Sequence, residues 1–319
     1  MPYLPPGVRE MPDESGFHDD AIVPVALAIE EILQNPRFGG ALKDAALRLV
    51  AIHDEAPRIV RYVADMQKWL LTQAILALHF EHATDPSRPG LTAANLVAFL
   101  VDNNVASKNT AIAHLAEMRN YRLLLDVEGA GDRRSRPLRL ADIAERLIRE
   151  WFDGHLRSLD ALDQGTRSAQ SMADRRLLWH AHPKLARGLF YDPGWCEPPE
   201  AVGAFVRTGS GSNILHDLMS RLPPDHGREA RTWIGDLRIS ELTRRYIISR
   251  SHAQRVFARA RALDIVGWER PGNSGAFWVS ERLISDYRHW QAVKFSAIDA
   301  AFQWARGHLC GSRPLEKMK

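Results

Sequence analysis

The sequence predicts a mostly α-helical fold with tandem winged helix-turn-helix domains, whose wings are small β-hairpins. The main observation is that one pattern occurs twice in the 319 residues, at 107–140 and at 249–279. Each copy has a polar cap, a helix, an apolar strand, a turn that contains glycine, and a second strand. This is the order of a recognition helix followed by a wing.

A shift of 142 residues aligns the two copies and pairs residues of the same character. Serine begins both copies, and Ser107 or Asn109 is expected to cap the first helix. The apolar pairs recur at helical spacing, so Leu115 and Phe257 are expected to be equivalent core residues. The aligned pairs are Ser107 with Ser249, Ala111 with Ala253, Leu115 with Phe257, Leu123 with Ile265, and Leu124 with Val266.

The length suggests about two domains, and proline or glycine marks several boundaries. We divide the chain into an N-terminal arm with helices (1–56), a first winged-helix domain (57–165), a helical linker region (166–225) and a second winged-helix domain (226–319).

In the first half, residues 1–20 are rich in proline, glycine and acid and are expected to be irregular. Thr92 is a good N-cap for the helix that precedes the first recognition helix. Pro137 has no N–H group, which favours an edge strand. The predicted elements are helices at 22–34, 41–52, 57–85, 93–101 and 107–121, strands at 123–128 and 137–140, and a helix at 141–162.

In the second half, Ser251 and Gln254 have the spacing of a capping box and predict the start of the second recognition helix. The turn PGNSG predicts a hairpin. The other predicted elements are helices at 173–181, from about 200, at 213–222, 228–237 and 240–246, strands at 265–269 and 276–279, and a closing helix at 281–306.

Composition limits the class of protein. Cys196 and Cys310 provide neither a disulfide framework nor a metal-binding spacing. The sequence has no signal peptide and no stretch apolar enough to span a bilayer, so we expect a cytoplasmic protein without a membrane partner. The net charge is only +3, but residues 227–306 contain 14 Lys and Arg against 8 Asp and Glu. We therefore expect a local basic surface, dominated by the second copy.

The two recognition helices and the first wing carry the expected contacts to double-stranded DNA. The arginine fork matches guanine edges and phosphates, and asparagine can read adenine. Arginines in a wing suit phosphate or the minor groove. The predicted DNA-binding residues are Lys108, Asn109, His114, Arg133, Arg134 and Arg136 in the first copy, and Arg250, His252, Arg255 and Arg259 in the second.

From Lys68 to Leu162 the chain resembles the multiple antibiotic resistance regulator (MarR) family. The resemblance lies in Asp132-Arg133-Arg134, in Leu138-Arg139-Leu140, and in the order of the helices around them. It implies a wing that approaches DNA and a homodimer formed by terminal helices. This chain has Ala141 where the family usually has Thr, and its second copy lacks Asp-Arg-Arg. Two copies in one chain could replace a dimer, so both arrangements stay open.

Other candidate sites are weak, and no catalytic constellation or cofactor motif is evident. His79 with His82, His180 with His182, the 209–212 Gly-Ser turn and Cys196 each lack the partners that their chemistry requires. An aromatic cluster could line an effector pocket or pack the two halves together; it comprises Trp179, Phe190, Tyr191 and Trp195.

The sequence thus predicts a sequence-specific transcriptional regulator and not an enzyme, with a small-molecule effector left open. The alternatives are a winged-helix scaffold for protein interactions and a plasmid-type replication initiator. Binding through phosphates should weaken steeply with salt, which separates DNA binding from a scaffold role.

Overall fold

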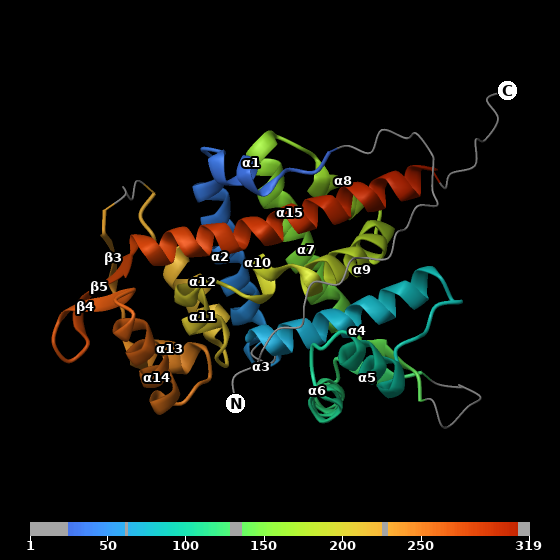
Figure 1. Cartoon of the computed structure of the whole chain (residues 1–319), viewed down its shortest axis with the longest axis horizontal. Coiled ribbons are helices and arrows are strands. Elements are labelled where there is room, and N and C mark those ends of the chain that lie inside the picture. The colour runs from blue at the N-terminus through green and yellow to red at the C-terminus, as the bar shows by residue number, and fades with distance from the viewer. Residues whose placement is uncertain (1–24, 61–62, 128–135, 225–228, 312–319) are drawn as a thin grey trace.

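A computed structural model describes residues 25–60, 63–127, 136–224 and 229–311, which form many helices and two small antiparallel sheets (Figure 1). The helices are α1 (Ile29–Gln34), α2 (Phe38–Glu55), α3 (Pro57–Val60), α4 (Met66–Thr84), α5 (Ala93–Asp102), α6 (Lys108–Asn120), α7 (Asp142–Asp163), α8 (Arg167–Ala173), α9 (Arg176–Tyr191), α10 (Pro193–Cys196), α11 (Glu200–Val206), α12 (Gly211–Ser220), α13 (Ile239–Arg245), α14 (Arg250–Ala262) and α15 (Glu281–Gly311). The strands are β1 (Leu124–Asp126), β2 (Leu138–Leu140), β3 (Arg231–Asp236), β4 (Val266–Arg270) and β5 (Ser274–Ser280).

The long helix α15 runs along the molecule and joins its two ends (Figure 1). Helix α9 packs against both α4 and α15, and α2 packs against both α7 and α12. The rings of Trp195 and Trp290 are stacked, with their centroids 4.4 Å apart, and the ring centroids of Trp69 and Trp195 are 5.0 Å apart. Apolar side chains from both ends of the chain thereby form one continuous core.

Residues 91–163, here the first unit, contain α5, α6, the β1–β2 hairpin and α7. Leu124 pairs with Leu140 in the hairpin, and the Leu138 amide donates to the Leu91 carbonyl at 2.8 Å. Leu91 thus lies beside the hairpin, directly before α5. The order is two helices, hairpin and closing helix.

Residues 231–290, here the second unit, repeat this order with a fuller sheet. Strand β5 lies between β3 and β4, and the first part of α15 follows it. The Trp278 ring covers Gly267, where an added Cβ would lie 2.6 Å from the ring. Glycine is therefore required at this close approach between β4 and β5.

The two predicted recognition helices correspond in detail. Helices α6 and α14 each have 13 residues, and their bounds differ by the same shift as the sequence copies. Ser107 and Ser249 each cap their helix by accepting a hydrogen bond from the backbone amide three residues on. Just beyond the helices, Arg122 and Asp264 are left-handed, with φ of 55° and 51°. The internal similarity is thus present in backbone geometry.

The equivalent apolar positions are also buried in both units. Ala111 and Ala253 are fully buried, and Leu115 and Phe257 are 5% and 1% exposed. The strand residues that follow each helix are buried as well. The prediction that Leu115 and Phe257 are core residues is therefore confirmed.

Several expectations for local structure are wrong. The predicted helix at 57–85 is interrupted, because α3 ends at Val60 and α4 begins at Met66 after an extended cap at Asp65. The predicted helix at 173–181 is divided between the end of α8 and the start of α9.

Residues 231–236 form strand β3 rather than a helix, because their alternate side chains Thr232 and Ile234 are buried against β5. Ser249, not Ser251, caps α14, so the capping-box interpretation fails. The first described helix begins at Ile29 rather than at residue 22. The predicted irregular arm at 1–20 lies outside the described residues.

Polar contacts attach the second unit to α2. Arg245 in α13 donates to Asp54 at 2.9 Å, and its carbonyl lies 2.9 Å from Nε2 of His53. Asn213 lies 3.1 Å from Nδ1 of the same ring. The arrangement uses both His53 nitrogens and holds α13 against the central helices.

Candidate nucleic-acid interface

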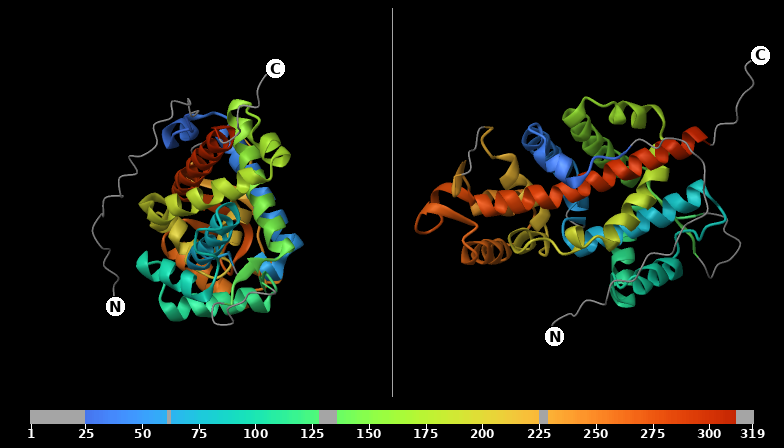
Figure 2. Two further views of the ribbon diagram at one scale, coloured as in Figure 1. Left: turned by 90° about the vertical axis from the view of Figure 1, so that its right-hand side faces the viewer. Right: turned by 45° about the horizontal axis from the view of Figure 1, so that its top comes forward.

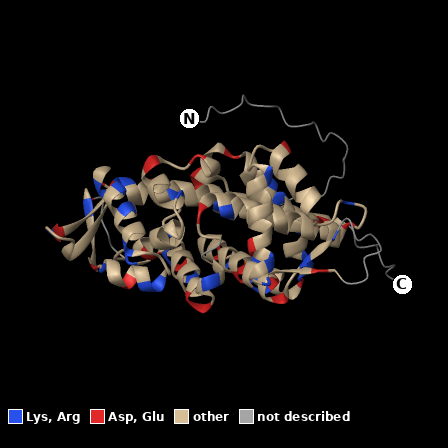
Figure 3. Cartoon of the chain, turned by 90° about the horizontal axis from the view of Figure 1, so that it is seen from below, with Lys and Arg blue, Asp and Glu red and all other residues tan. Residues whose placement is uncertain are grey.

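Helices α6 and α14 lie on the same side of the molecule. This is the lower side in Figure 1, and both views in Figure 2 agree with it. Figure 3 shows the molecule from this side, with Lys and Arg on the elements around α14, at the end that carries the three-stranded sheet. The two predicted recognition helices can therefore face one partner together.

The exposed surface of α14 is basic. The helix contains four arginines and no Asp or Glu. Arg250, Arg255 and Arg259 are exposed, and within the described chain none of these guanidinium groups forms a hydrogen bond or ion pair with protein. These three predicted DNA-binding residues are thus available to an anionic partner.

His252, the fourth predicted residue of α14, is half-buried. Its Nε2 lies 2.9 Å from the Gly209 carbonyl. The ring therefore orients the start of α14 against the turn before α12, which sequence reasoning did not anticipate.

Helix α6 presents a different surface. Lys108 and Asn109 are exposed, as predicted, and Ile112 is 44% exposed beside them. Ala113 occupies the position of Arg255, and Glu117 the position of Arg259. Glu117 forms an ion pair of 2.9 Å with Lys68. The corresponding surface is therefore much less basic than that of α14.

The assignment of His114 to the exposed surface is wrong. His114 is 3% exposed and lies 3.0 Å from the Thr72 hydroxyl of α4. Burial lowers the pKa of His114 to about 4, so the ring is neutral at pH 7. The cause is helical spacing: together with Ala111, Leu115 and Met118, residue 114 lies on the buried face.

Helices α6 and α14 are each tied to the following hairpin by an arginine at an equivalent position. Arg119 in α6 donates to Asp126 at 2.9 Å, and Arg261 in α14 donates to Asn273 at 2.8 Å. Of the predicted first-wing residues, Arg136 is exposed with φ of 38°. Arg133 and Arg134 lie outside the described residues.

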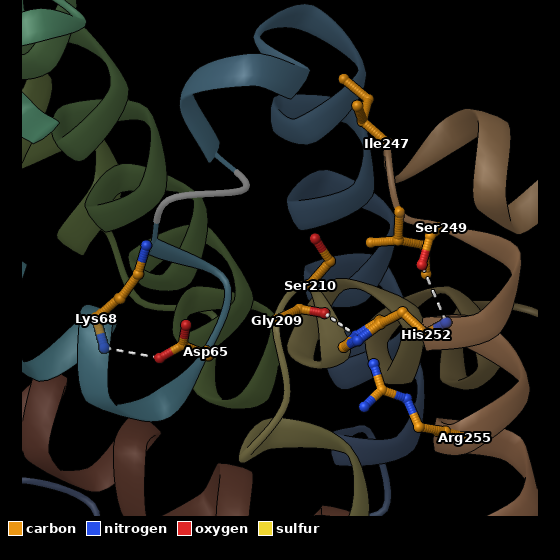
Figure 4. Close-up of a pocket in the computed structure, with 9 residues that line it drawn as sticks. Asp65, Lys68, Gly209, Ser210, Ile247, Ser249, His252 and Arg255 are labelled. Atoms are coloured by element: carbon orange, nitrogen blue, oxygen red, sulfur yellow. Dashed lines mark hydrogen bonds between the residues drawn. The ribbon is translucent and has the colours of Figure 1, made fainter.

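A cleft of about 310 Å³ lies between the first turn of α4 and the start of α14 (Figure 4). Lys68 lies on one wall, and His252 and Arg255 lie on the other (Figure 4). Asp65 also lines the cleft; it caps α4 by accepting from the Lys68 amide at 2.8 Å, and burial raises the pKa of Asp65.

The charges around this cleft nearly balance, because Lys68 contacts Glu117 and Asp65 faces Arg255 across the opening. The cleft by itself is therefore not a strong anion site. The cleft instead marks where the two helices approach each other, because the first turn of α4 contacts α6 on one side and faces α14 on the other.

The weaker sequence candidates have structural roles. His182 is buried and lies 2.8 Å from Gln73, and Ser210 is buried at the start of α12. Burial raises the pKa of Cys196 to about 11, which disfavours a reactive thiolate. Trp195 packs in the core, whereas Tyr191 is 58% exposed, so the expected aromatic cluster does not form one pocket. No group of three or more His, Cys, Asp and Glu suited to a metal occurs among the described residues.

No protein-family model, curated protein or solved structure was found to match this chain. Among the helices that the structure describes, none has the length and apolar character needed to cross a membrane.

Proposed function

We propose that the chain is a sequence-specific transcriptional regulator that binds double-stranded DNA through two winged helix-turn-helix units. The observation that carries the proposal is the repeated order of cap, helix and hairpin, with both copies of the helix on one side of the molecule. The second helix of a helix-turn-helix pair enters the major groove, and its N-terminal residues contact base edges.

The chemistry of α14 supports this proposal. A recognition helix needs exposed donors that the protein does not already use, and Arg250, Arg255 and Arg259 meet that condition within the described chain. Arginine can form two hydrogen bonds with guanine and also contacts phosphates. We therefore expect α14 to contribute more to DNA affinity than α6.

Replacing two of these arginines tests the proposal. Arg255→Ala combined with Arg259→Ala should weaken binding to a selected duplex by about 1–3 kcal/mol for each base-reading arginine. Binding is measured by fluorescence anisotropy with selected and random duplexes. The matched control is Arg157→Ala with Arg176→Ala, which removes the same charge from α7 and α9. Unchanged affinity of the α14 variant for both duplexes contradicts the proposal, and an equal loss in the control means that only net charge matters.

Two alternatives make different predictions. A winged-helix scaffold for protein interactions predicts no salt-sensitive duplex binding. A plasmid-type replication initiator is also favoured by two units in one chain, and it predicts binding to repeated sites at a replication origin. The cytoplasmic location, a small-molecule effector and a MarR-like homodimer stay predictions.

A further inference from the structure

The two recognition helices are held in a fixed relation within one chain. Lys68 in the first turn of α4 contacts Glu117 of α6 at 2.9 Å and lines the cleft whose opposite wall is α14. His114 of α6 is also bonded to α4, through Thr72. Helices α6 and α14 therefore flank the same end of α4.

The second unit cannot turn freely about this point. Arg245 of α13 bonds to Asp54 of α2, and His53 connects the Arg245 carbonyl with Asn213 of α12. The apolar core continues through both units. The spacing of α6 and α14 is thus set inside one chain, where a homodimer would set it between two.

The exposed faces of the two helices differ at equivalent positions. Helix α14 has Arg255 and Arg259 where α6 has Ala113 and Glu117. A symmetric dimer presents two identical faces and so reads a palindrome. Two unlike faces in one chain instead require two unlike half-sites.

The exposed residues indicate what each half-site contains. On α14, the exposed arginines match the O6 and N7 acceptors of guanine. On α6, Asn109 matches the edge of adenine, and the apolar Ile112 beside it suits the methyl group of thymine.

We infer that a single chain binds one non-palindromic duplex, with α14 in a guanine-containing major groove and α6 in a neighbouring major groove at A·T pairs. This inference rests on the proposed function and adds the stoichiometry and the base preference of each half. Helices that enter successive major grooves on one face read half-sites whose centres are about 10–10.5 base pairs apart.

Selection from a random duplex pool, followed by native mass spectrometry, tests the inference with the full chain. The expected result is one chain per duplex and a site with a guanine-containing half and an A·T half. Two chains on a palindrome overturn the inference but leave the proposed function intact. If no duplex is enriched and none binds saturably, both are overturned.

Two variants then test which helix reads which half of the DNA site. Arg255→Ala should lower affinity roughly 5- to 150-fold and relax the preference only in the guanine-containing half, whereas Asn109→Ala should act only on the A·T half. Both side chains are exposed, and thermal melting confirms that each variant folds. If either variant relaxes both halves equally, the assignment of one helix to each half is overturned.

Discussion

His114 has a structural role in the core, although the sequence suggested that its side chain contacts DNA. It lies on α6, the proposed recognition helix of the first unit, but it is buried against Thr72 and stays neutral because burial lowers its pKa to about 4. In the unfolded chain a histidine has a pKa of about 6.5. The unfolded state therefore binds more protons below pH 6.5, and the folded state loses stability as the pH falls towards 4.

His114→Val removes this pH dependence, because valine has no titratable group. Valine is chosen because it is the residue at the equivalent position of α14, Val256. The Thr72 hydroxyl keeps its hydrogen bond to the Lys68 carbonyl. Between pH 7 and pH 4, we expect the free energy of unfolding to fall by up to about 3 kcal/mol less in the variant than in the wild type. Urea denaturation at both pH values measures the difference. Parallel pH profiles would show that His114 does not titrate differently in the two states.

Leu115 and Phe257 provide a second test at single positions. Both are buried at equivalent points of their helices. Leu115→Ala and Phe257→Ala should each lower the free energy of unfolding by roughly 2–5 kcal/mol. Ile112→Ala is the control, because its side chain is 44% exposed, and it should change stability by less than about 0.5 kcal/mol. An unchanged melting temperature for either core variant refutes their equivalence.

At the scale of elements, Arg167 joins α8 to the core. Its guanidinium donates to Asp299 of α15 at 2.8 Å and to Asp163 of α7 at 2.8 Å. Asp299 is fully buried. Removing the arginine would leave this carboxylate buried without its main partner, which is costly.

Arg167→Ala should therefore lower the free energy of unfolding by about 3–5 kcal/mol. The matched control is Arg176→Ala, which breaks the exposed pair with Asp174 and should change it by less than about 1 kcal/mol. Both are measured by chemical denaturation at pH 7. Equal effects would mean that burial of the Arg167 network contributes nothing to stability.

The sequence predicts elements well where local signals determine them. Helices α6 and α14 follow from apolar residues at helical spacing, although the start of α14 was predicted from Ser251 and its cap is Ser249. Strand β3 was missed, because it depends on pairing with β5 across more than 40 residues of sequence. Its alternating buried residues, Thr232 and Ile234, were the available signal. The burial of His114 was likewise readable from its spacing to Ala111.

At the scale of the whole molecule, the sequence predicts the repeat but not how its two copies are arranged in space. Nothing in the sequence shows that α6 and α14 face the same side, because that depends on the packing of α9 between α4 and α15 and of α2 between α7 and α12. These contacts join segments far apart in the chain. The individual roles of Lys68 and His252 at the cleft depend on the same packing.

The central claim is that the chain binds duplex DNA through basic side chains on this face. The most direct measurement is the affinity for a random duplex between about 50 and 200 mM salt. The account predicts that log K falls linearly with log salt, with a slope of about −0.9 per phosphate bound, and that Arg255→Ala with Arg259→Ala flattens the slope by about 0.9 for each phosphate that the variant no longer binds. Affinity that does not change with salt, or the absence of duplex binding at low salt, would contradict the account and favour a protein-interaction scaffold.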